Sequence, residues 1–374
     1  MSLGLQKTKI YFVNKVEQTN KLLQKGSLAI VLKANDIESE EFETKLYEFR
    51  TYEEALKKLK KDIVKLNESG DQALELAFRG AVNRPFKIYV VVTKDDATLM
   101  TDVENLESVK FDWFCAPEFE SKAKEISDWI IMLNEKRDLE VKAVVSNYNA
   151  DSEYIVNFTT SDIVMKKLAS KSNVKIDSTI GVARVTSALC GTPLTRAITN
   201  LQLDDILSVE RLSNEEYDTK IDNGELVLFN DWDKVRFGRG VNSLTTLADK
   251  NAERKKILII SKMHLWKREV KEIINEKFLG AFQNSIDEKM LLVTAIKEYN
   301  NTLADKGVIL QTADSIVDID IEAQEDYLVN EQNIDTSEMT EKEIRDAKTD
   351  TFVFIKANLL FTDAMEDIIV KVAS

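Results

Sequence analysis

The sequence is poor in the residues on which cross-links, metal centres and hydrolytic sites depend. Its 374 residues include 2 cysteines, 1 histidine, 3 prolines and 11 glycines. Cys115 and Cys190 lie far apart and fit neither a disulfide framework nor a zinc pattern, so we expect a fold without cross-links. A single histidine excludes an HExxH motif and a histidine-rich metal site. The scarcity of proline and glycine leaves little room for flexible linkers.

Long hydrophobic runs are also absent. No apolar run approaches the length of a membrane span, and Met1 to Gly4 lacks the charged-then-apolar layout of a signal peptide. We therefore expect synthesis and assembly in the cytoplasm, without membrane insertion. Because 44% of the residues are hydrophobic and 31% are charged, the chain is expected to be globular, with two or three domains and a full hydrophobic core.

Positive charge is in short supply and unevenly distributed. The formal net charge of −14 disfavours direct binding to nucleic acid, because phosphate backbones select basic surfaces. Residues 1–26 carry five lysines and one acidic residue, a net of +4, whereas residues 314–346 carry twelve acidic residues and two basic ones, a net of −10. Taken alone, such segments are typical of a disordered basic tail and a solvated acidic face.

The first half of the chain shows strand-like and helix-like patterns in alternation. The predicted strands span 28–33, 86–93, 111–115 and 141–146, and the predicted helices span about 40–77, 124–137 and 179–190. The residues that set these patterns include Leu56, Leu59, Ile63 and Leu66 on one face of the first helix, and Phe111, Trp113 and Cys115 at alternate positions of the third strand. Strands alternating with helices indicate a mostly parallel sheet covered on both faces.

The second half begins with a hairpin pattern. Two apolar runs, Glu225–Phe229 and Lys234–Phe237, flank a turn-forming cluster at Asn230–Asp233. Further helices are predicted at 255–277 and about 287–304, and further strands at 307–311, 316–322 and 351–355. After the hairpin, the pattern thus passes from long helices back to strands.

Two β-prone runs lie outside these units, one near each end of the chain. They comprise Ile10, Tyr11, Phe12 and Val13 near the start, and Ile368, Ile369, Val370 and Val372 near the end. An exposed strand has unpaired backbone groups and needs a partner sheet. The sequence therefore predicts that both runs pair with strands elsewhere.

Residues with catalytic potential are better explained as structural. His264 lies between cationic neighbours on a predicted helix, so a packed or surface histidine is favoured over a general base. Cys190 ends a helix of small residues, where a buried thiol packs as a small hydrophobe, and Cys115 is interpreted in the same way. The Ser121 and Lys124 pair has S-x-x-K spacing but lacks the companion motifs of that enzyme class.

Ligand-binding motifs are equally incomplete. Gly238-Arg239-Gly240 does not extend to a dinucleotide fingerprint, and no GxxxxGK[ST] phosphate loop exists. Asn230, Asp231 and Asp233 offer oxygen ligands for calcium, but the glycine and distal glutamate of an EF-hand loop are missing, so an ordinary turn is expected. We therefore predict no catalytic residue, no cofactor and no metal.

Blocks of sequence in the second half carry a resemblance to a known family. They are ARVTSALCGTPLTRAITN (183–200), GELVLFNDWDKVRFGRGVNSLTT (224–246), IDIEAQEDYL (319–328), TEKEIRDAKTDTFVFIKANL (340–359) and TDAMEDIIVKV (362–372). In order and spacing they resemble the tail sheath proteins of contractile phages and phage-tail-like R-type bacteriocins, especially those of Gram-positive prophages. Residues 26–160 match this family only in general character.

The resemblance implies an α/β plus α+β fold with two domains and two arms. The first domain is expected to be a mostly parallel αβα sheet with a subtilisin-like layout but no protease site, and the second a C-terminal α+β sheath domain. The expected boundaries are 1–25 for the N-terminal arm, 26–250 and 251–361 for the domains, and 362–374 for the C-terminal arm. The arms would add strands to the C-terminal domains of adjacent subunits.

The function implied by the resemblance is structural rather than enzymatic. Such a subunit forms a homo-oligomeric helical polymer around an inner tail tube protein, contacts baseplate and tail terminator proteins, and contracts to drive the tube through a bacterial envelope. It would be released in a phage tail or bacteriocin particle. The alternatives are the sheath of a cell-borne contractile injection system and an α/β enzyme with an unrecognised acidic site.

The resemblance also suggests a contact with the inner tube. The helix expected around Glu341–Lys348 would lie near the tube, with Lys342, Arg345 and Lys348 as its basic residues. Mixed charge suits a polar contact that must release when the tube slides. The alternative is a solvated helix face without a partner.

Overall fold

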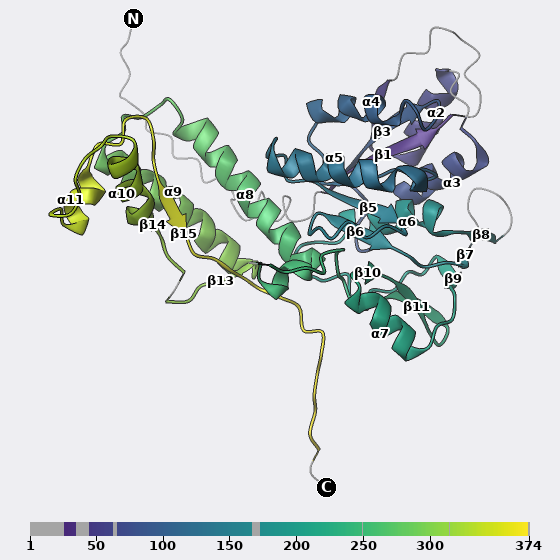
Figure 1. Cartoon of the computed structure of the whole chain (residues 1–374). Coiled ribbons are helices and arrows are strands. Elements are labelled where there is room, and N and C mark those ends of the chain that lie inside the picture. The colour runs from purple at the N-terminus through teal and green to yellow at the C-terminus, as the bar shows by residue number, and fades with distance from the viewer. Residues whose placement is uncertain are drawn as a thin grey trace, which may run out of the picture.

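The computed structural model describes residues 26–34, 45–62, 66–166, 173–248, 250–313 and 315–372. The predicted N-terminal arm, with Ile10, Tyr11, Phe12 and Val13, lies outside the described residues. Figure 1 shows a sheet region, built from the elements up to β12, and a C-terminal region that begins with the long helix α8 and leads away from it.

A seven-stranded sheet forms the centre of the sheet region. In spatial order its strands are β10 (Glu225–Leu226), β6 (Ile155–Phe158), β5 (Lys142–Ser146), β4 (Trp113–Cys115), β1 (Ser27–Lys33), β3 (Lys87–Thr93) and β2 (Leu46–Phe49). All neighbours pair in parallel except β2, which runs antiparallel to β3. The strands predicted at 28–33, 86–93 and 141–146 and the mostly parallel sheet are therefore confirmed.

Helices cover both faces of this sheet. One face packs against α2 (Tyr52–Lys61), α3 (Glu68–Ala77) and α6 (Ser178–Cys190), and the other against α4 (Leu99–Val103) and α5 (Ala123–Glu135). Alternate side chains of β1 enter opposite cores, with Leu28 and Ile30 on the α6 side and Ala29 and Val31 on the α5 side. Burial on both faces explains the continuous apolar sequence of this strand.

Two sequence predictions about these layers were wrong in detail. The helix expected at about 40–77 is divided, because β2 precedes α2, and Leu56 is 41% exposed although Leu59 is buried. Phe111 does not share a face with Trp113 and Cys115, since β4 begins only at Trp113 and Phe111 packs in the opposite core. In both cases local spacing suggested a longer regular element than the packing allows.

Small elements extend the sheet region beyond the main sheet. They are β7 (Ile163–Met165), β8 (Val174–Ile176), β9 (Ile206–Ser208), α7 (Asn214–Asp222), β11 (Leu228–Asp231), β12 (Lys234–Phe237) and the 3₁₀ helices at Glu104–Ser108, Glu120–Lys122 and Ala252–Lys255. The hairpin prediction is confirmed for β11 and β12, which pair antiparallel across a turn at Trp232. The first predicted run is split, because Glu225 and Leu226 join the main sheet as β10.

The C-terminal region combines helices with two small antiparallel sheets. Its elements are α8 (Ile257–Lys277), α9 (Ile286–Asp305), β13 (Ile309–Leu310), β14 (Val317–Ile319), α10 (Ile321–Asn330), α11 (Glu341–Asp346), β15 (Ile355–Ala357) and β16 (Leu360–Phe361), with β13 pairing β16 and β14 pairing β15. The strand predicted at 316–322 ends at Ile319, because the Asp320 side chain accepts the Ala323 amide and caps α10. The strand predicted at 351–355 begins only at Ile355.

Candidate assembly interface

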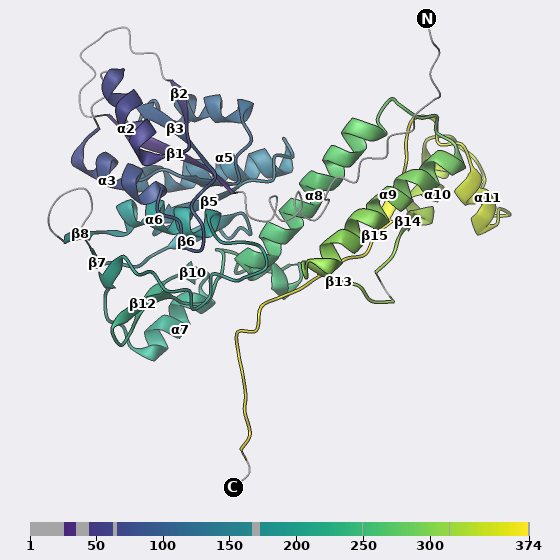
Figure 2. The same cartoon turned by 180° about the vertical axis from the view of Figure 1, so that it is seen from behind.

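The C-terminal segment leaves the body of the protein as an extended chain. In Figures 1 and 2 it runs back from the C-terminal region past the start of α8 and then projects away from both regions. The side chains of Ile368, Ile369, Val370 and Val372 are 74%, 88%, 75% and 85% exposed. These residues carry no regular structure and pair with no strand in the described part of the chain, so the apolar run is uncovered.

The residues just before this run, 362–367, are anchored to the protein, and we call them the arm root. Lys262 donates hydrogen bonds of 2.6 Å to the carbonyl and hydroxyl oxygens of Thr362, whose amide donates to the Val308 carbonyl. Lys256 forms ion pairs with Asp363 and, at 3.1 Å, with Glu366. The predicted C-terminal arm therefore divides into a bound root and a free end.

Glu366 is the most buried carboxylate of the arm root. Its side chain is 6% exposed, and Oε1 accepts a hydrogen bond of 2.6 Å from the Thr199 hydroxyl. Arg239 Nη1 lies 3.9 Å from Glu366 Oε2, while Nη2 bonds to Asp367 Oδ1 at 2.6 Å. The hydrogen bond that Arg239 donates to Asp367 raises the pKa of Arg239, because it favours the charged guanidinium.

A glycine beside this cluster keeps Thr199 in place. The Gly240 amide donates a hydrogen bond of 2.9 Å to the Thr199 hydroxyl, which in turn donates to Glu366. A Cβ at Gly240 would lie 2.7 Å from Cγ2 of Ile198, so a larger residue would displace this loop. The Gly238-Arg239-Gly240 sequence, which fits no nucleotide site, thus contacts the arm root directly through Arg239, while Gly240 binds the Thr199 hydroxyl that donates to Glu366.

The two small sheets of the C-terminal region have open edges. Each is two-stranded among the described residues, and Leu310 of β13 and Leu360 of β16 are 49% and 41% exposed. A groove of about 380 Å³ lies beside β15 and β16, where α8 contributes Met263 and Trp266 and the strand segment contributes Leu359 and Phe361. Open strand edges next to apolar side chains are suited to an added strand.

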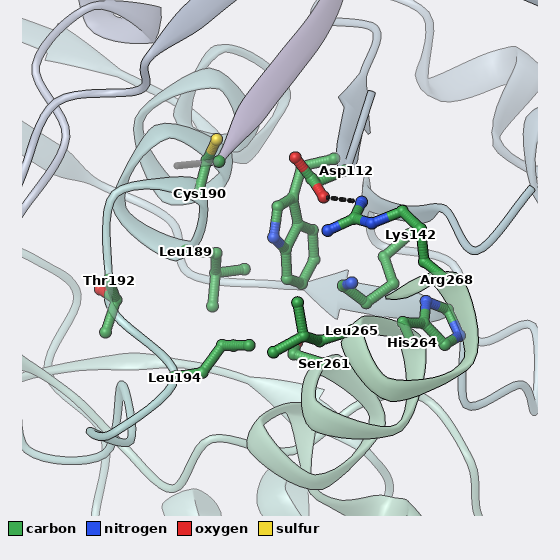
Figure 3. Close-up of a pocket in the computed structure, with 12 residues that line it drawn as sticks. Asp112, Lys142, Leu189, Cys190, Thr192, Leu194, Ser261, His264, Leu265 and Arg268 are labelled. Carbon is green, nitrogen blue, oxygen red and sulfur yellow. Dashed lines mark hydrogen bonds and ion pairs between the residues drawn. The ribbon is translucent and has the colours of Figure 1, made fainter. Parts of the chain in front are cut away.

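A charged cluster joins α8 to the main sheet, as Figure 3 shows. Arg268 donates to Asp112 at 2.6 Å, and the Lys142 ammonium lies 4.9 Å from the Trp113 ring centre, beside a cavity of about 50 Å³. Burial lowers the pKa of Lys142 to about 8. This cluster attaches the two regions to each other through buried charge.

His264 and both cysteines lie in packed surroundings. Burial holds the pKa of His264 well below its usual value, and its Nε2 lies 3.8 Å from Glu140. Burial raises the pKa of Cys115 to about 12 and that of Cys190 well above its usual value. A buried, protonated thiol is the opposite of the activated thiolate that a nucleophilic site requires.

The hairpin turn uses its polar side chains internally. Asn230 donates to the carbonyl oxygens of Val209 and Glu210 at 3.0 and 3.2 Å, and Asp231 forms an ion pair with Arg236 at 2.7 Å. Among the residues with a described position, no group of three or more histidines, cysteines and acidic residues is arranged to hold a metal ion. No helix in the described ranges is long and apolar enough to cross a membrane.

The basic residues proposed for tube contact differ in their surroundings. Lys342 lies exposed on α11, and Lys348 lies exposed just beyond it. Arg345 is half-buried and forms an ion pair with Asp318 of β14. Arg345 therefore stabilises the C-terminal region itself, while the two lysines are available to a partner.

The fold defines an α/β protein with an anchored, apolar C-terminal arm. Residues 91–243 match the family described as phage tail sheath protein central domain. The tail sheath protein of Clostridium phage phiCD119 is 33% identical over 354 residues, which cover 93% of each chain. The chain belongs to the phage tail sheath family. It is accordingly a structural sheath subunit, as the resemblance in its second half predicts.

Solved structures with lower sequence identity share the fold. The sheath tail protein from Desulfitobacterium hafniense is 12% identical with a TM-score of 0.68, over 86% of this chain and 93% of that chain. The sheath tail protein from Listeria innocua is 15% identical with a TM-score of 0.65, over 80% and 90%. The helical sheath of the anti-feeding prophage in its contracted state is 15% identical with a TM-score of 0.65, over 94% and 93%.

Proposed function

We propose that this protein polymerises helically around an inner tail tube and contracts to drive that tube through a bacterial envelope. The observation that carries the proposal is the exposed apolar run 368–372 on an anchored root, together with small C-terminal sheets whose edges are open as far as the described residues extend. The similar anti-feeding prophage chain comes from a helical sheath in a contracted state. The run is therefore interpreted as a strand for a neighbouring subunit.

The arms of adjacent subunits would hold the polymer together by strand addition. A strand added to the β13–β16 or β14–β15 edge gains main-chain hydrogen bonds, and alternate side chains enter pockets on the partner. Each hydrogen bond contributes only about 0.5 to 1.5 kcal/mol net. Several such connections per subunit stabilise the lattice even though each one contributes little free energy. Once one arm is bound, the effective concentration of the remaining arms at their sites is high.

Contraction would then be a rigid-body rotation of subunits about their arms, with no nucleotide as fuel. In this proposal the chain divides into an N-terminal arm at 1–25, domains at 26–250 and 251–361, and a C-terminal arm at 362–374. The parallel sheet with helices on both faces supports a subtilisin-like layout for the first domain. The buried His264 and the protonated thiols support a subunit without catalytic activity.

The proposed partners are further copies of this chain, the inner tube, and the baseplate and terminator proteins that end the polymer. One similar chain was solved in the anti-feeding prophage baseplate, which supports a baseplate contact. The exposed Lys342 and Lys348 are the proposed tube contacts, with Arg345 holding their helix. Assembly would take place in the cytoplasm, followed by release in a tail or bacteriocin particle. Neither an enzyme nor a cell-borne system is favoured over this function.

Deletion of the arms tests the proposal. Removing 368–374, or the predicted strand 10–13, should leave a folded monomer, while the full chain forms tubes or fibres visible by electron microscopy. Unchanged circular dichroism would establish that the deletions leave the core intact, and residues 368–372 belong to neither hydrophobic cluster of the sheet. Tubes that persist after both deletions would exclude arm-mediated polymerisation.

A further inference from the structure

The arm root shows an inverted pattern of burial. Glu366 is buried to 6% exposure, whereas the neighbouring apolar side chains of Met365 and Ile368 are 91% and 74% exposed. A hydrophobic contact would bury the methionine and isoleucine and leave the glutamate in water. Polar contacts, rather than apolar packing, therefore hold this part of the chain on the surface.

The partners of Glu366 come from three separate parts of the sequence. Thr199 follows α6, Arg239 follows β12, and Lys256 immediately precedes α8. Thr199 and Arg239 belong to the sheet region, whereas Lys256 begins the C-terminal region. A single carboxylate thus spans the junction between the two regions.

A buried carboxylate is stable only while its charges and hydrogen bonds are matched. Removing it from water is costly unless cations and donors replace the lost hydration. Glu366 has a hydroxyl donor at 2.6 Å, an ammonium at 3.1 Å and a guanidinium at 3.9 Å. By comparison, the Arg239–Asp367 pair involves a carboxylate that is 73% exposed, and such surface pairs contribute little.

We propose that Glu366 is a clip that fixes the direction in which the C-terminal arm leaves the subunit. The clip presents 368–372 to a second copy of this chain in an already extended form, and this role rests on the arm exchange proposed above. Pre-organising a binding segment reduces the entropy lost when it docks. The Gly238-Arg239-Gly240 sequence after the hairpin serves this clip, because it supplies Arg239 and, through Gly240, orients Thr199.

Distance measurements on the monomer test the clip directly. A spin label at Met365→Cys in the arm root and a second at Asp222→Cys, at the end of α7, report how narrowly the root is held. The native cysteines are both buried, so labelling is confined to the introduced thiols. Double electron–electron resonance should give one narrow distance distribution in the otherwise wild-type chain and a broad one in Glu366→Gln, which keeps the size of the side chain and loses its charge.

Polymerisation provides the second measurement. Glu366→Gln should raise the critical concentration for tube formation about tenfold, because the neutral side chain loses its ion pairs with Lys256 and Arg239. Glu276→Gln, which neutralises an exposed glutamate on α8 outside the acidic segment 314–346, should leave both measurements unchanged. Lys256→Met removes the cation that pairs with the same carboxylate. The double variant with Glu366→Gln should raise the critical concentration little beyond the larger of the two single effects, because both changes remove the same ion pair.

The outcomes separate the clip from the arm exchange on which it rests. A narrow distance distribution in Glu366→Gln overturns the clip, and so does a broad distribution with unchanged polymerisation. If deletion of 368–374 leaves polymerisation intact, the arm exchange is wrong. The clip then has no role in assembly, even if Glu366→Gln broadens the spin-label distance distribution. A chain that loses polymerisation on deletion but tolerates Glu366→Gln retains the arm exchange and loses only the clip.

Discussion

Arg268, near the middle of α8, donates a hydrogen bond of 2.6 Å to Asp112, which stands immediately before β4. The second carboxylate oxygen of Asp112 accepts bonds of 2.7 and 2.8 Å from the amide and hydroxyl of Ser27 at the start of β1. Burial opposes the charge of Asp112, but Arg268, the Ser27 amide and Lys142 together outweigh it and hold the pKa of that carboxyl below its usual range. One ion pair thus attaches α8 to two central strands of the sheet.

Replacing Arg268 by Met should destabilise the protein by about 2 kcal/mol, because Asp112 would keep its burial and lose its cation. Urea unfolding of the monomer measures this change. Lys277→Met removes an exposed cation from the end of the same helix and should change stability by less than about 0.5 kcal/mol. Equal effects of the two substitutions would show that the Asp112 pair does not stabilise the junction.

Lys142 should make stability rise with pH in the alkaline range. Its pKa is about 8 in the folded protein and about 10.4 in an unfolded chain. Between these values the unfolded chain binds more protons, so the free energy of unfolding increases as pH rises through this window. Lys142→Met removes this contribution, so the wild type should gain on the order of 1 kcal/mol relative to the variant between pH 8 and 9.5.

The comparison of urea unfolding at pH 7, 8.5 and 9.5 measures this difference, with Lys124→Met as a control for an exposed lysine. The window ends below about pH 10 for a physical reason. Burial raises the pKa of Tyr52 and Tyr154 to about 12, so ionisation of tyrosines in the unfolded chain begins to favour unfolding there. A difference between wild type and Lys142→Met that stays constant with pH would contradict the assignment.

The sequence alone predicts the parts of this fold that depend on local patterns. The apolar residues around Val90 and around Ile130 follow the patterns expected of a buried strand and of an amphipathic helix, and the structure has β3 and α5 there. The helix α7 is absent from the predicted elements, although Ser213 and Glu216 form a capping box, a signal that is visible in the sequence. Sequence patterns are sufficient to predict a helix or strand when its own apolar residues determine which of its faces is buried.

The anchoring of the arm was not predictable in the same way. Glu366 meets Thr199 and Arg239 across separations of 167 and more than 100 residues, and no local period encodes such a contact. The division of the apolar run at Glu225–Phe229 has a similar origin, because β10 pairs with β6 of the main sheet rather than with β12. Tertiary contacts decide both features, and they override local strand preference.

Assembly should slow as ionic strength rises. The segments 1–26 and 314–346 have net charges of +4 and −10, and the proposed function brings the arms of one subunit to the C-terminal region of another. Attraction between exposed charges is weak for each pair and is screened by salt. Light scattering at increasing sodium chloride concentration measures the rate. Faster assembly at high salt would instead indicate a hydrophobic driving force between surfaces that repel each other.

The inner surface of the sheath provides the last prediction. Lys342 and Lys348 are exposed, whereas Arg345 forms an ion pair with Asp318. A charge reversal at all three positions would therefore disturb the C-terminal region as well as any tube contact. The pair Lys342→Glu and Lys348→Glu avoids this problem. It should weaken loading of the sheath onto tubes by roughly tenfold while tube-free polymerisation continues, because two attractive contacts become repulsive.

Co-sedimentation with preformed tubes measures the loading. The matched control, Lys277→Glu with Lys297→Glu, makes the same change in net charge at exposed positions of α8 and α9. Arg345→Met, measured separately by urea unfolding, should lower stability by about 1 kcal/mol through loss of its pair with Asp318. If the lysine pair and the control load equally well, the basic residues around α11 do not face the tube, and the polar contact must lie on another surface of the subunit.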